Sequence, residues 1–481
     1  MFTDRSADVA DRTPHRGYGA AVTPGVDGPC VLVTGYGDEN RLLTWRDGAL
    51  RDVASSAVAD PGRHAIGVAA ADLDADGDEE LYVHNTDEFG GHTRDTDLLL
   101  DPVDGFPDAD GARWRDLFGL GVNADRGNFR AGRSVAALDR YGTGRYGVFV
   151  ASYGAPSRFY ELGDDGELSD MASAVGLDVD ACGRSLLAGP VVSDRMDLFV
   201  GVERGPNRLF RNDRGHFEDV AAAAGVDDPD GDARGVTYAD GGVACGNWEG
   251  PSRLFTPDAD GGPADGGRFV DAAPPAFAAP TRVRTVVAAD FDNDGRDELF
   301  VHAIGAENRL FRRERPVDAD ATTAGAPDAA DTDGASGGWT RIDAGPAAEP
   351  SGLGTGAAVA DVDGDGSLEL LLVHGELAAQ PLTLFGADGD GDWLRIRPTT
   401  QYGAPARGAA VTLETDAWTK TRVVCAGSGY LCQMEPVAHF GLGDATPERA
   451  TVRWPDGRET ELSAPTPRRE HEIPHPMAPR F

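Results

Sequence analysis

Three acidic segments of the chain share one spacing of carboxylates. Asp stands at positions 1, 3 and 5, Gly at position 6 and Glu at position 9 of residues 72–80, 290–298 and 361–369. Ca²⁺ takes about six to eight hard oxygen ligands, and a chain that turns sharply at a glycine can wrap alternating carboxylates around the ion. Position 7 would add its main-chain carbonyl, so its side chain is free to vary. The spacing predicts about three Ca²⁺ sites, with the candidate ligand residues Asp72, Asp74, Asp76, Asp78, Glu80, Asp290, Asp292, Asp294, Arg296, Glu298, Asp361, Asp363, Asp365, Ser367 and Glu369.

These segments differ from an EF-hand after their first six residues. An EF-hand places Glu at position 12 and is flanked by helices, whereas position 12 here is Val83, Val301 or Leu372 within strand-like apolar runs. Asp-Gly turns are common in an Asp-rich chain, but chance would not repeat the same four acids three times. Related segments at 139–144, 193–197 and 238–242 lack the full set, and we expect them to be metal-free turns.

The acidic segments belong to a repeat that runs through most of the chain. A short apolar run recurs seven times, at residues 31–33, 81–83, 148–150, 198–200, 243–245, 299–301 and 370–372. A second apolar anchor and a third element follow most of these runs, and a strand of small residues leads into the next unit. Four short strands per unit, joined by Gly, Asp and Asn turns, are typical of a propeller blade. We therefore expect an all-β protein with a seven-bladed β-propeller over residues 1–386, because a β-helix has a shorter period and β-sandwiches need longer units.

The character of the chain changes after the repeats. Residues 314–338 are rich in Ala, Asp, Thr and Gly, and we expect an acidic, disordered, low-complexity insert within the sixth blade. Residues 387–392 read as a linker. Alternating apolar positions over 393–462 predict a small β domain, and the Pro- and Arg-rich residues 463–481 predict a flexible tail.

Several motifs resemble known families. Residues 17–386 resemble the FG-GAP (VCBS-type) repeats of integrin-α-like propellers. Residues 393–462 resemble the ASPIC/UnbV domain that follows such propellers in cartilage-acidic-protein-like proteins. The segments that carry this second resemblance are 403–409 (GAPARGA), 426–431 (AGSGYL), 439–443 (HFGLG) and 452–457 (VRWPDG). The resemblance implies calcium at the acidic positions and a binding role rather than catalysis.

The charge balance excludes some classes of partner. The chain has 44 Lys and Arg against 81 Asp and Glu, a net charge of −37, and Lys420 is its single lysine. Nucleic acids and anionic membranes are disfavoured, because both require clustered cationic side chains. Halophilic proteins use such acidic surfaces to remain soluble in concentrated salt, and we expect that adaptation here.

The N-terminal residues, the apolar runs and the cysteines bear on the cellular compartment of the protein. Residues 1–16 contain no apolar signal-peptide core, and no run approaches the roughly 18 apolar residues of a membrane span. The five cysteines form no C-x-x-C pair, so a disulfide framework is not expected, and a bond between Cys425 and Cys432 across a turn stays open. These features favour the cytoplasm, whereas the family resemblance leaves an extracellular protein possible.

Other candidate side chains have simpler interpretations. We expect His84, His302 and His374 to be hydrogen-bonded polar residues at strand exits, because equivalent positions of a propeller lie far apart. Ser428 lacks the G-x-S-x-G frame of a hydrolase nucleophile, and the loop residues Trp114 and Trp248 suit packing between blades better than sugar stacking. The sequence thus predicts a non-enzymatic, calcium-stabilised protein that binds a protein or carbohydrate. A propeller lyase or hydrolase acting on polysaccharide and an assembly scaffold stay open as alternatives.

Overall fold

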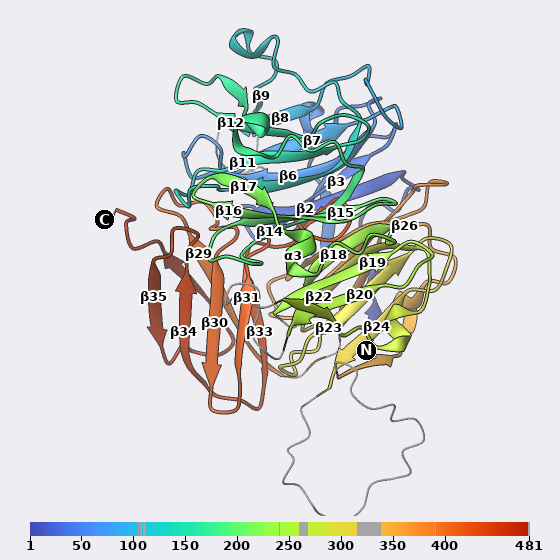
Figure 1. Ribbon diagram of the computed structural model, residues 1–481. Coiled ribbons are helices and arrows are strands. Elements are labelled where there is room, and N and C mark those ends of the chain that lie inside the picture. The colour runs from blue at the N-terminus through green and yellow to red at the C-terminus, as the bar shows by residue number, and fades with distance from the viewer. Residues whose placement is uncertain are drawn as a thin grey trace, which may run out of the picture.

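The computed structural model describes the whole chain except residues 104, 106–107, 109–111, 240, 259–267, 315–337, 388, 390 and 480–481. Strands dominate the described residues, which confirms the all-β class (Figure 1). The helical pieces are single turns: η1 (Ser6–Asp8), α1 (Ser56–Ala59), η2 (Gly121–Asn123), α2 (Ala172–Val175), α3 (Ala221–Ala224), α4 (Pro275–Ala278) and η4 (Gly345–Ala348). The segment 314–338, expected to be a disordered insert, lies almost entirely outside the described residues.

Within the described residues, seven sheets follow one another along the chain, and each contains four strands that pair antiparallel with their neighbours. Their first strands are β2 (Gly17–Pro24), β6 (Ala65–Ala71), β10 (Gly132–Leu138), β14 (Gly183–Gly189), β18 (Ala233–Ala239), β22 (Val283–Ala289) and β26 (Gly354–Ala360). The second strands are β3 (Pro29–Gly35), β7 (Glu80–Asn85), β11 (Gly147–Ser152), β15 (Asp197–Val202), β19 (Gly242–Asn247), β23 (Glu298–Ala303) and β27 (Glu369–His374).

The outer strands of these sheets are shorter and more exposed. The third strands are β4 (Arg41–Arg46), β8 (Leu98–Pro102), β12 (Arg158–Leu162), β16 (Arg208–Asp213), β20 (Arg253–Pro257), β24 (Arg309–Arg313) and β28 (Thr383–Ala387). The fourth strands are β5 (Ala49–Asp52), β9 (Trp114–Asp116), β13 (Leu168–Asp170), β17 (His216–Asp219), β21 (Phe269–Asp271), β25 (Trp339–Ile342) and, for the seventh sheet, β1 (Phe2–Asp4).

The apolar runs of the sequence explain this packing. All seven runs lie in second strands and are fully buried, because both faces of these strands pack against neighbouring sheets. First strands carry small residues and lie side by side, β2 next to β6 and so on to β26, which in turn contacts β2. This ring of contacts gives a propeller-like arrangement, in which each sheet covers the apolar face of the next.

The N-terminal strand completes the last sheet. β1 pairs antiparallel with β28, with Phe2 opposite Ala387. The Phe2 ring packs edge-on against Phe291 at 5.0 Å and Phe300 at 6.0 Å between centroids, which joins the chain start to the sixth sheet. The repeat pattern did not predict this pairing, because three residues carry no periodic signal.

The C-terminal residues form a second β unit beside the ring, drawn in orange and red in Figure 1. One sheet has the order β33-β29-β36, and the other β31-β30-β34-β35. Their strands are β29 (Asp392–Thr399), β30 (Ala410–Thr415), β31 (Thr419–Val423), β33 (Ala438–Gly443), β34 (Pro447–Arg453), β35 (Glu459–Ser463) and β36 (Arg469–Pro474). Leu394, Ile396, Val411, Leu413, Val452 and Trp454 are all buried in one core between these sheets.

The tail expected to be flexible is ordered over much of its length. β36 pairs in parallel with β29, from Leu394 opposite Arg469 to Thr399 opposite Pro474, and Ile473 is buried in the C-terminal core. The expectation of a flexible segment 463–481 was therefore wrong for these residues. Pro and Arg are compatible with an edge strand, because an edge strand leaves one row of backbone groups unpaired.

A loop of the C-terminal unit enters the centre of the ring. Residues 426–433 contact the first strand of every one of the seven sheets, and β32 (Cys432–Gln433) pairs in parallel with β2. The contacts run from Ala426 to Ala137, Gly427 to Ala188, Gly429 to Val236, Tyr430 to Thr285, Cys432 to Ala20 and Ala357, and Gln433 to Ala70. The C-terminal unit is thus built into the ring rather than joined to it by a linker alone.

Candidate functional site

The three acidic segments form equivalent loops. Each connects the first strand of a sheet to the second, between β6 and β7, β22 and β23, and β26 and β27. The glutamates at position 9, Glu80, Glu298 and Glu369, are the first residues of the second strands, as the spacing predicted. All three loops lie at the same end of the ring, because antiparallel sheets with one strand order place their first turns on one side.

Three hydrogen bonds recur in all of these loops. The glycine N–H at position 6 donates to the Asp at position 1, the N–H at position 7 donates to the Asp at position 5, and the N–H at position 2 donates to the Glu at position 9. The distances span 3.0–3.2 Å, 2.7–2.9 Å and 2.6–3.1 Å for the three kinds of bond. The backbone thus curves around the carboxylates and holds them on its inner side.

The loops bring the expected acids together. In each of three groups, one carboxylate oxygen from every member lies within 4.8 Å of the others: Asp72 with Asp74 and Glu80, Asp290 with Asp292 and Asp294, and Asp361 with Asp363 and Asp365. Asp76 forms a further group with Asp74 and Asp101, a residue of β8 that the loop spacing did not reveal. Like charges at this separation repel each other unless a cation or protons neutralise them.

Burial makes this repulsion stronger. Desolvation raises the pKa of Asp72 and Asp290 to about 7 and that of Asp361 to about 6. Burial and neighbouring aspartates raise the pKa of Glu298 and Glu369 to about 9, and that of Glu80 well above its ordinary value. The three glutamates therefore hold protons at neutral pH unless a cation replaces the protons.

Each loop also contains a buried carboxylate oxygen that has no hydrogen-bond partner among the described residues. These atoms are Glu80 Oε1, Asp292 Oδ1 and Asp361 Oδ1. Among the described carboxyl groups, a fourth such oxygen is found only on Asp60. An unpaired buried carboxylate oxygen is costly, and a cation bound by oxygen ligands would satisfy one such oxygen in each loop. The donor set consists of hard oxygens, which suit Ca²⁺.

Arginines near the loops are partners that the spacing did not predict. Arg312 of β24 pairs with Asp292 and with Glu298 (2.9 Å), and Arg5 pairs with Asp363 (2.8 Å) and Glu369 (2.6 Å). Arg296, at position 7, pairs its side chain with Asp294, which leaves its main-chain carbonyl as the available ligand. These guanidinium groups neutralise part of the charge from the outer side of the loops.

The C-terminal unit covers the end of the ring that carries the loops. The position-6 glycines Gly77, Gly295 and Gly366 have φ of 103°, 86° and 89°. A Cβ on Gly366 would lie 1.9 Å from the Trp393 ring, so both the turn and this contact require glycine.

Lys420 and Arg422 of the C-terminal unit bind Asp297 of the second acidic loop, at 2.9 and 2.5 Å. Burial would raise the pKa of Asp297, but these two cations hold it at about 2.

Two of the cavities between the described residues of the ring and of the C-terminal unit border the second acidic loop. One, of about 690 Å³, is lined by Asp292, Asp294 and residues 443–447, and gives water access to the second acidic loop. The other, of about 430 Å³, is lined by β14, β18 and β22 on one side and by Arg422, Glu435 and His439 on the other. His439 Nε2 lies 2.7 Å from Asn293 Oδ1, so its ring is fixed to the second loop.

The segments expected to be metal-free have a different geometry. The carboxylate of Asp139 accepts hydrogen bonds from the N–H groups of Tyr141, Gly142 and Gly144 at 2.6–3.2 Å. Asp197 accepts those of Val191, Val192 and Ser193 at 2.8–3.1 Å. The oxygens of these single acids are thus satisfied by backbone donors. Asp240, in the third segment, lies outside the described residues.

The remaining candidates have mixed outcomes. The guanidinium of Arg284 lies 4.2 Å from the Trp248 ring, and Trp114 packs against the apolar core between the first two sheets. All five cysteines are free, including Cys425 and Cys432. His84 bonds to Asp97 of its own sheet. The expectation that these histidines lie far apart was wrong for His302 and His374, which are not at equivalent strand positions and whose rings are 5.4 Å apart.

Known proteins resemble almost the whole chain. Residues 399–480 match the family model described as ASPIC and UnbV, which extends beyond the expected end at residue 462. Cartilage acidic protein 1 of Mus musculus is 40% identical over 93% of this chain and 71% of its own length. The Homo sapiens protein of the same name is 40% identical over 92% of this chain and 69% of its own length. The chain belongs to the cartilage acidic protein 1 family.

Membership of the cartilage acidic protein 1 family confirms the resemblance that the C-terminal motifs carry. A solved structure, the BP39L lectin from Burkholderia pseudomallei, aligns over 78% of this chain with 13% identity and a TM-score of 0.42. Among the described residues, no helix has the length and apolarity to span a membrane.

Proposed function

We propose that this member of the cartilage acidic protein 1 family is a calcium-stabilised, non-enzymatic binding protein. In this proposal the seven sheets are the seven blades of a closed FG-GAP-type propeller, and its three acidic loops hold Ca²⁺. Bound Ca²⁺ supplies charge neutralisation and a cross-link between the first two strands of a blade. The observation that carries the proposal is the unpaired buried carboxylate oxygen in each of the three loops.

The named ligands follow from the loop geometry. The carboxylates of Asp72, Asp74 and Glu80 would hold one ion, with Asp76 and the carbonyl of Asp78 on its exposed side. Asp290, Asp292, Asp294 and Glu298 would hold the second, and Asp361, Asp363, Asp365 and Glu369 the third. The carbonyls of Arg296 and Ser367 complete these sets. Arg312 of β24 and Arg5, which directly follows β1, remain outside the ions, paired with Glu298 and Glu369.

The end of the ring opposite the acidic loops is the favoured partner surface. The C-terminal unit covers the loop end and residues 426–433 fill the centre, so the opposite rim is what the ring presents to a partner. This rim exposes Phe89 and Leu377, of which 64% and 72% of the surface is accessible. Both lie in turns between second and third strands, and Phe89 rests on Tyr153 at 5.0 Å.

Arginines support the exposed Phe89 ring and the buried Tyr153 ring on which it rests. The guanidinium of Arg133 lies 5.0 Å from the Phe89 ring and 4.9 Å from the Tyr153 ring, and Arg184 lies 5.3 Å from Tyr153. Arginine and aromatic residues are enriched in binding hot spots, because they offer large, pre-ordered contact surfaces. A protein or a carbohydrate is the class of partner that such a surface suits.

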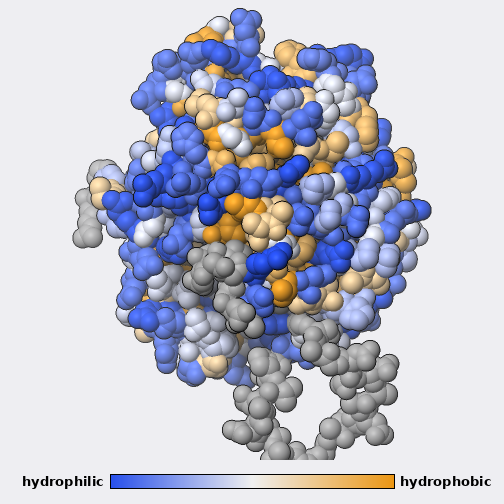
Figure 2. All heavy atoms as spheres, in the orientation of Figure 1, coloured by the Kyte–Doolittle hydropathy of each residue, from blue (hydrophilic) through white to orange (hydrophobic). Residues whose placement is uncertain are grey.

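Salt adaptation belongs to the same proposal. The formal net charge is −37, and Figure 2 shows a face dominated by hydrophilic residues with apolar groups in smaller patches. Concentrated salt screens the repulsion between these carboxylates, while the calcium sites neutralise the buried ones.

Calcium content and partner binding test the proposal separately. Equilibrium dialysis of the EDTA-treated protein against Ca²⁺ should find about three ions per chain. A Phe89→Ser, Leu377→Ser variant should keep this content and its Tm, but lose ligands captured by the native protein on glycan and protein arrays. Absence of calcium uptake would overturn the metal sites, and unchanged capture by the variant would overturn the binding rim.

A further inference from the structure

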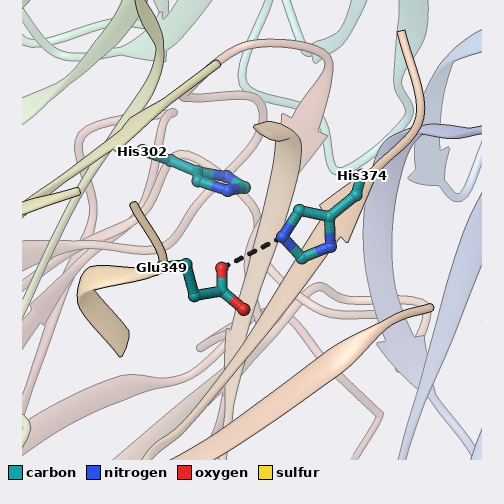
Figure 3. Close-up of side chains that lie close together, drawn as sticks. All are labelled: His302, Glu349 and His374. Atoms are coloured by element: carbon teal, nitrogen blue, oxygen red, sulfur yellow. Dashed lines mark hydrogen bonds and ion pairs between the residues drawn. The ribbon is translucent and has the colours of Figure 1, made fainter. Parts of the chain in front are cut away.

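A buried cluster of two histidines and a glutamate lies between the sixth and seventh sheets (Figure 3). His302 belongs to β23, His374 ends β27, and Glu349 directly follows η4. One possible ligand atom from each residue lies within 4.8 Å of the others. Glu298 and Glu369 begin the same two strands, so this cluster is at the strand ends remote from the acidic loops.

The two histidines face each other because they are offset by one residue. His302 is the fifth residue of β23, whereas His374 is the sixth residue of β27. Successive side chains of a strand point to opposite faces of a sheet. His302 therefore points toward the seventh sheet and His374 back toward the sixth, and their rings meet at right angles with centroids 5.4 Å apart.

The surroundings of His374 direct an imidazole lone pair toward Glu349. His374 Nδ1 lies 3.1 Å from the carbonyl oxygen of Pro381, which can only accept, so this nitrogen carries a proton. His374 Nε2 lies 3.0 Å from Glu349 Oε2, and the hydroxyl of Thr383 donates to Glu349 Oε1 at 2.8 Å. Between Nε2 and the carboxylate there must be either a second proton or a metal cation.

His302 distinguishes these two possibilities. It is completely buried, and among the described residues neither of its ring nitrogens has a partner at hydrogen-bond geometry, although the Gly356 backbone lies close to the ring. Burial and the nearby His374 lower the pKa of His302 well below its ordinary value, so its ring is neutral and has a free lone pair. A proton between His374 and Glu349 would leave His302 unsatisfied, whereas a metal ion would use all three side chains.

His84 provides an internal comparison. It occupies the same position of β7 as His302 does of β23, and it is equally buried. Its Nδ1 lies 2.9 Å from both carboxylate oxygens of Asp97, which also accepts hydrogen bonds from Asn85 and Asn128. His84 is thus held by a carboxylate that is already occupied, and no second histidine faces it within the described residues.

We propose that His302, His374 and Glu349 bind a divalent transition metal of the Zn²⁺ class, which ties the sixth sheet to the seventh. Neutral imidazole suits Zn²⁺ and is a poor ligand for Ca²⁺. Zn²⁺ ligands at about 2.0–2.2 Å from the ion lie roughly 3.3 Å apart, so small side-chain rotations would bring the present group, whose ligand atoms lie within 4.8 Å, to this spacing. Pro381 and Thr383 orient His374 and Glu349, as outer partners do in zinc sites.

Cobalt spectroscopy tests this site. Untagged protein is stripped with EDTA, saturated with Ca²⁺ to fill the acidic loops, and titrated with Co²⁺. We expect one equivalent to give visible d–d absorption, which Zn²⁺ then abolishes by displacement. His302→Gln should weaken Co²⁺ and Zn²⁺ binding at least about tenfold. Glu349→Gln should have the same effect, and it replaces His302→Gln in the test if the histidine variant does not fold.

His84→Gln is the matched control, and it should bind both metals like the native protein. Absence of saturable Co²⁺ and Zn²⁺ uptake would overturn the proposal and assign a proton to the His374–Glu349 contact. Equal binding by native protein, His302→Gln and Glu349→Gln would overturn it too, because the metal would then lie elsewhere.

Discussion

Arg407 and Glu79 form an ion pair that is sealed from water between the C-terminal unit and the ring. Arg407 Nε lies 2.5 Å from Glu79 Oε1 and Nη2 lies 2.8 Å from Oε2, and the exposed fractions of the two side chains are 0% and 1%. The guanidinium also donates to the carbonyls of Val22 and Cys425, at 2.7 and 2.8 Å. Glu79 is position 8 of the first acidic loop, so this pair joins a proposed calcium loop directly to the C-terminal unit.

Breaking this pair should strongly destabilise the protein. Arg407→Met leaves the Glu79 carboxylate buried, with the Thr23 hydroxyl at 2.9 Å as its one remaining partner in the described part of the chain. We expect a loss of about 3–5 kcal/mol in the free energy of unfolding, measured by denaturant titration. Arg449→Met removes an exposed pair with Glu414 and should cost less than about 1 kcal/mol. Similar losses in the two variants would contradict the structural role of the buried pair.

Removal of the last strand should unfold the C-terminal unit. A chain ending at Ser463 lacks β36, which exposes one edge of β29 and removes Ile473 from the core. We expect a lower Tm and increased hydrogen exchange in β29 and β33. A chain ending at Ala478 keeps β36 and should behave like the native protein. Identical Tm values for both truncations would support the flexible tail that composition alone suggests.

The repeat pattern predicted the strands well but not their closure. Apolar runs and turns locate the second strands, because burial on both faces demands continuous apolar residues. The pairing of β1 with β28 involves only Phe2–Asp4, too short a segment for a period. The entry of residues 426–433 into the ring depends on contacts with seven strands far away in sequence, and no local pattern encodes them.

The acidic loops were predictable and the histidine cluster was not recognised. Loop ligands lie within nine residues of one another, so their spacing alone reports their geometry. His302 and His374 belong to different sheets, and the signal in the sequence is their one-residue offset relative to Glu298 and Glu369. Arg5 and Arg312 approach the loops from other strands, which loop spacing cannot reveal.

Calcium-free protein should lose stability as the pH rises. The pKa values of Glu298 and Glu369 are raised to about 9, mainly by burial, so the folded state binds their protons more tightly than the unfolded state. The contribution of these two groups to the free energy of unfolding is largest below about pH 4.5 and is lost as the pH rises through about 9. We expect Tm in EDTA to fall between about pH 6 and 9, and calcium affinity to increase over the same range.

Glu298→Gln and Glu369→Gln should flatten this pH profile in EDTA, because an amide does not titrate. Glu461→Gln, on an exposed strand, should leave the profile unchanged. A native profile that is flat, or that rises with pH, would contradict buried, protonated carboxyl groups in the loops.

Salt should stabilise the protein. Raising KCl from about 0.1 M to about 1 M shortens the Debye length from about 10 Å to about 3 Å, which screens the repulsion from a net charge of −37. We expect a higher Tm in molar KCl, and a larger increase than for a protein of similar size with near-neutral charge. A Tm that is insensitive to KCl would contradict salt adaptation.

Thermal unfolding with and without calcium tests the central proposal most directly. The native protein is melted in molar KCl with EDTA and again after addition of millimolar Ca²⁺, alongside Asp74→Asn, Asp292→Asn and Asp363→Asn. When free Ca²⁺ is at about 100 times the Kd of a site, that site adds about 2.7 kcal/mol to the free energy of unfolding. The Tm of the native protein should therefore rise reversibly, and the Tm of each variant should rise less. Asp139→Asn should lower Tm equally in both conditions, since backbone donors satisfy Asp139. An identical Tm of the native protein in EDTA and in Ca²⁺ would contradict the account.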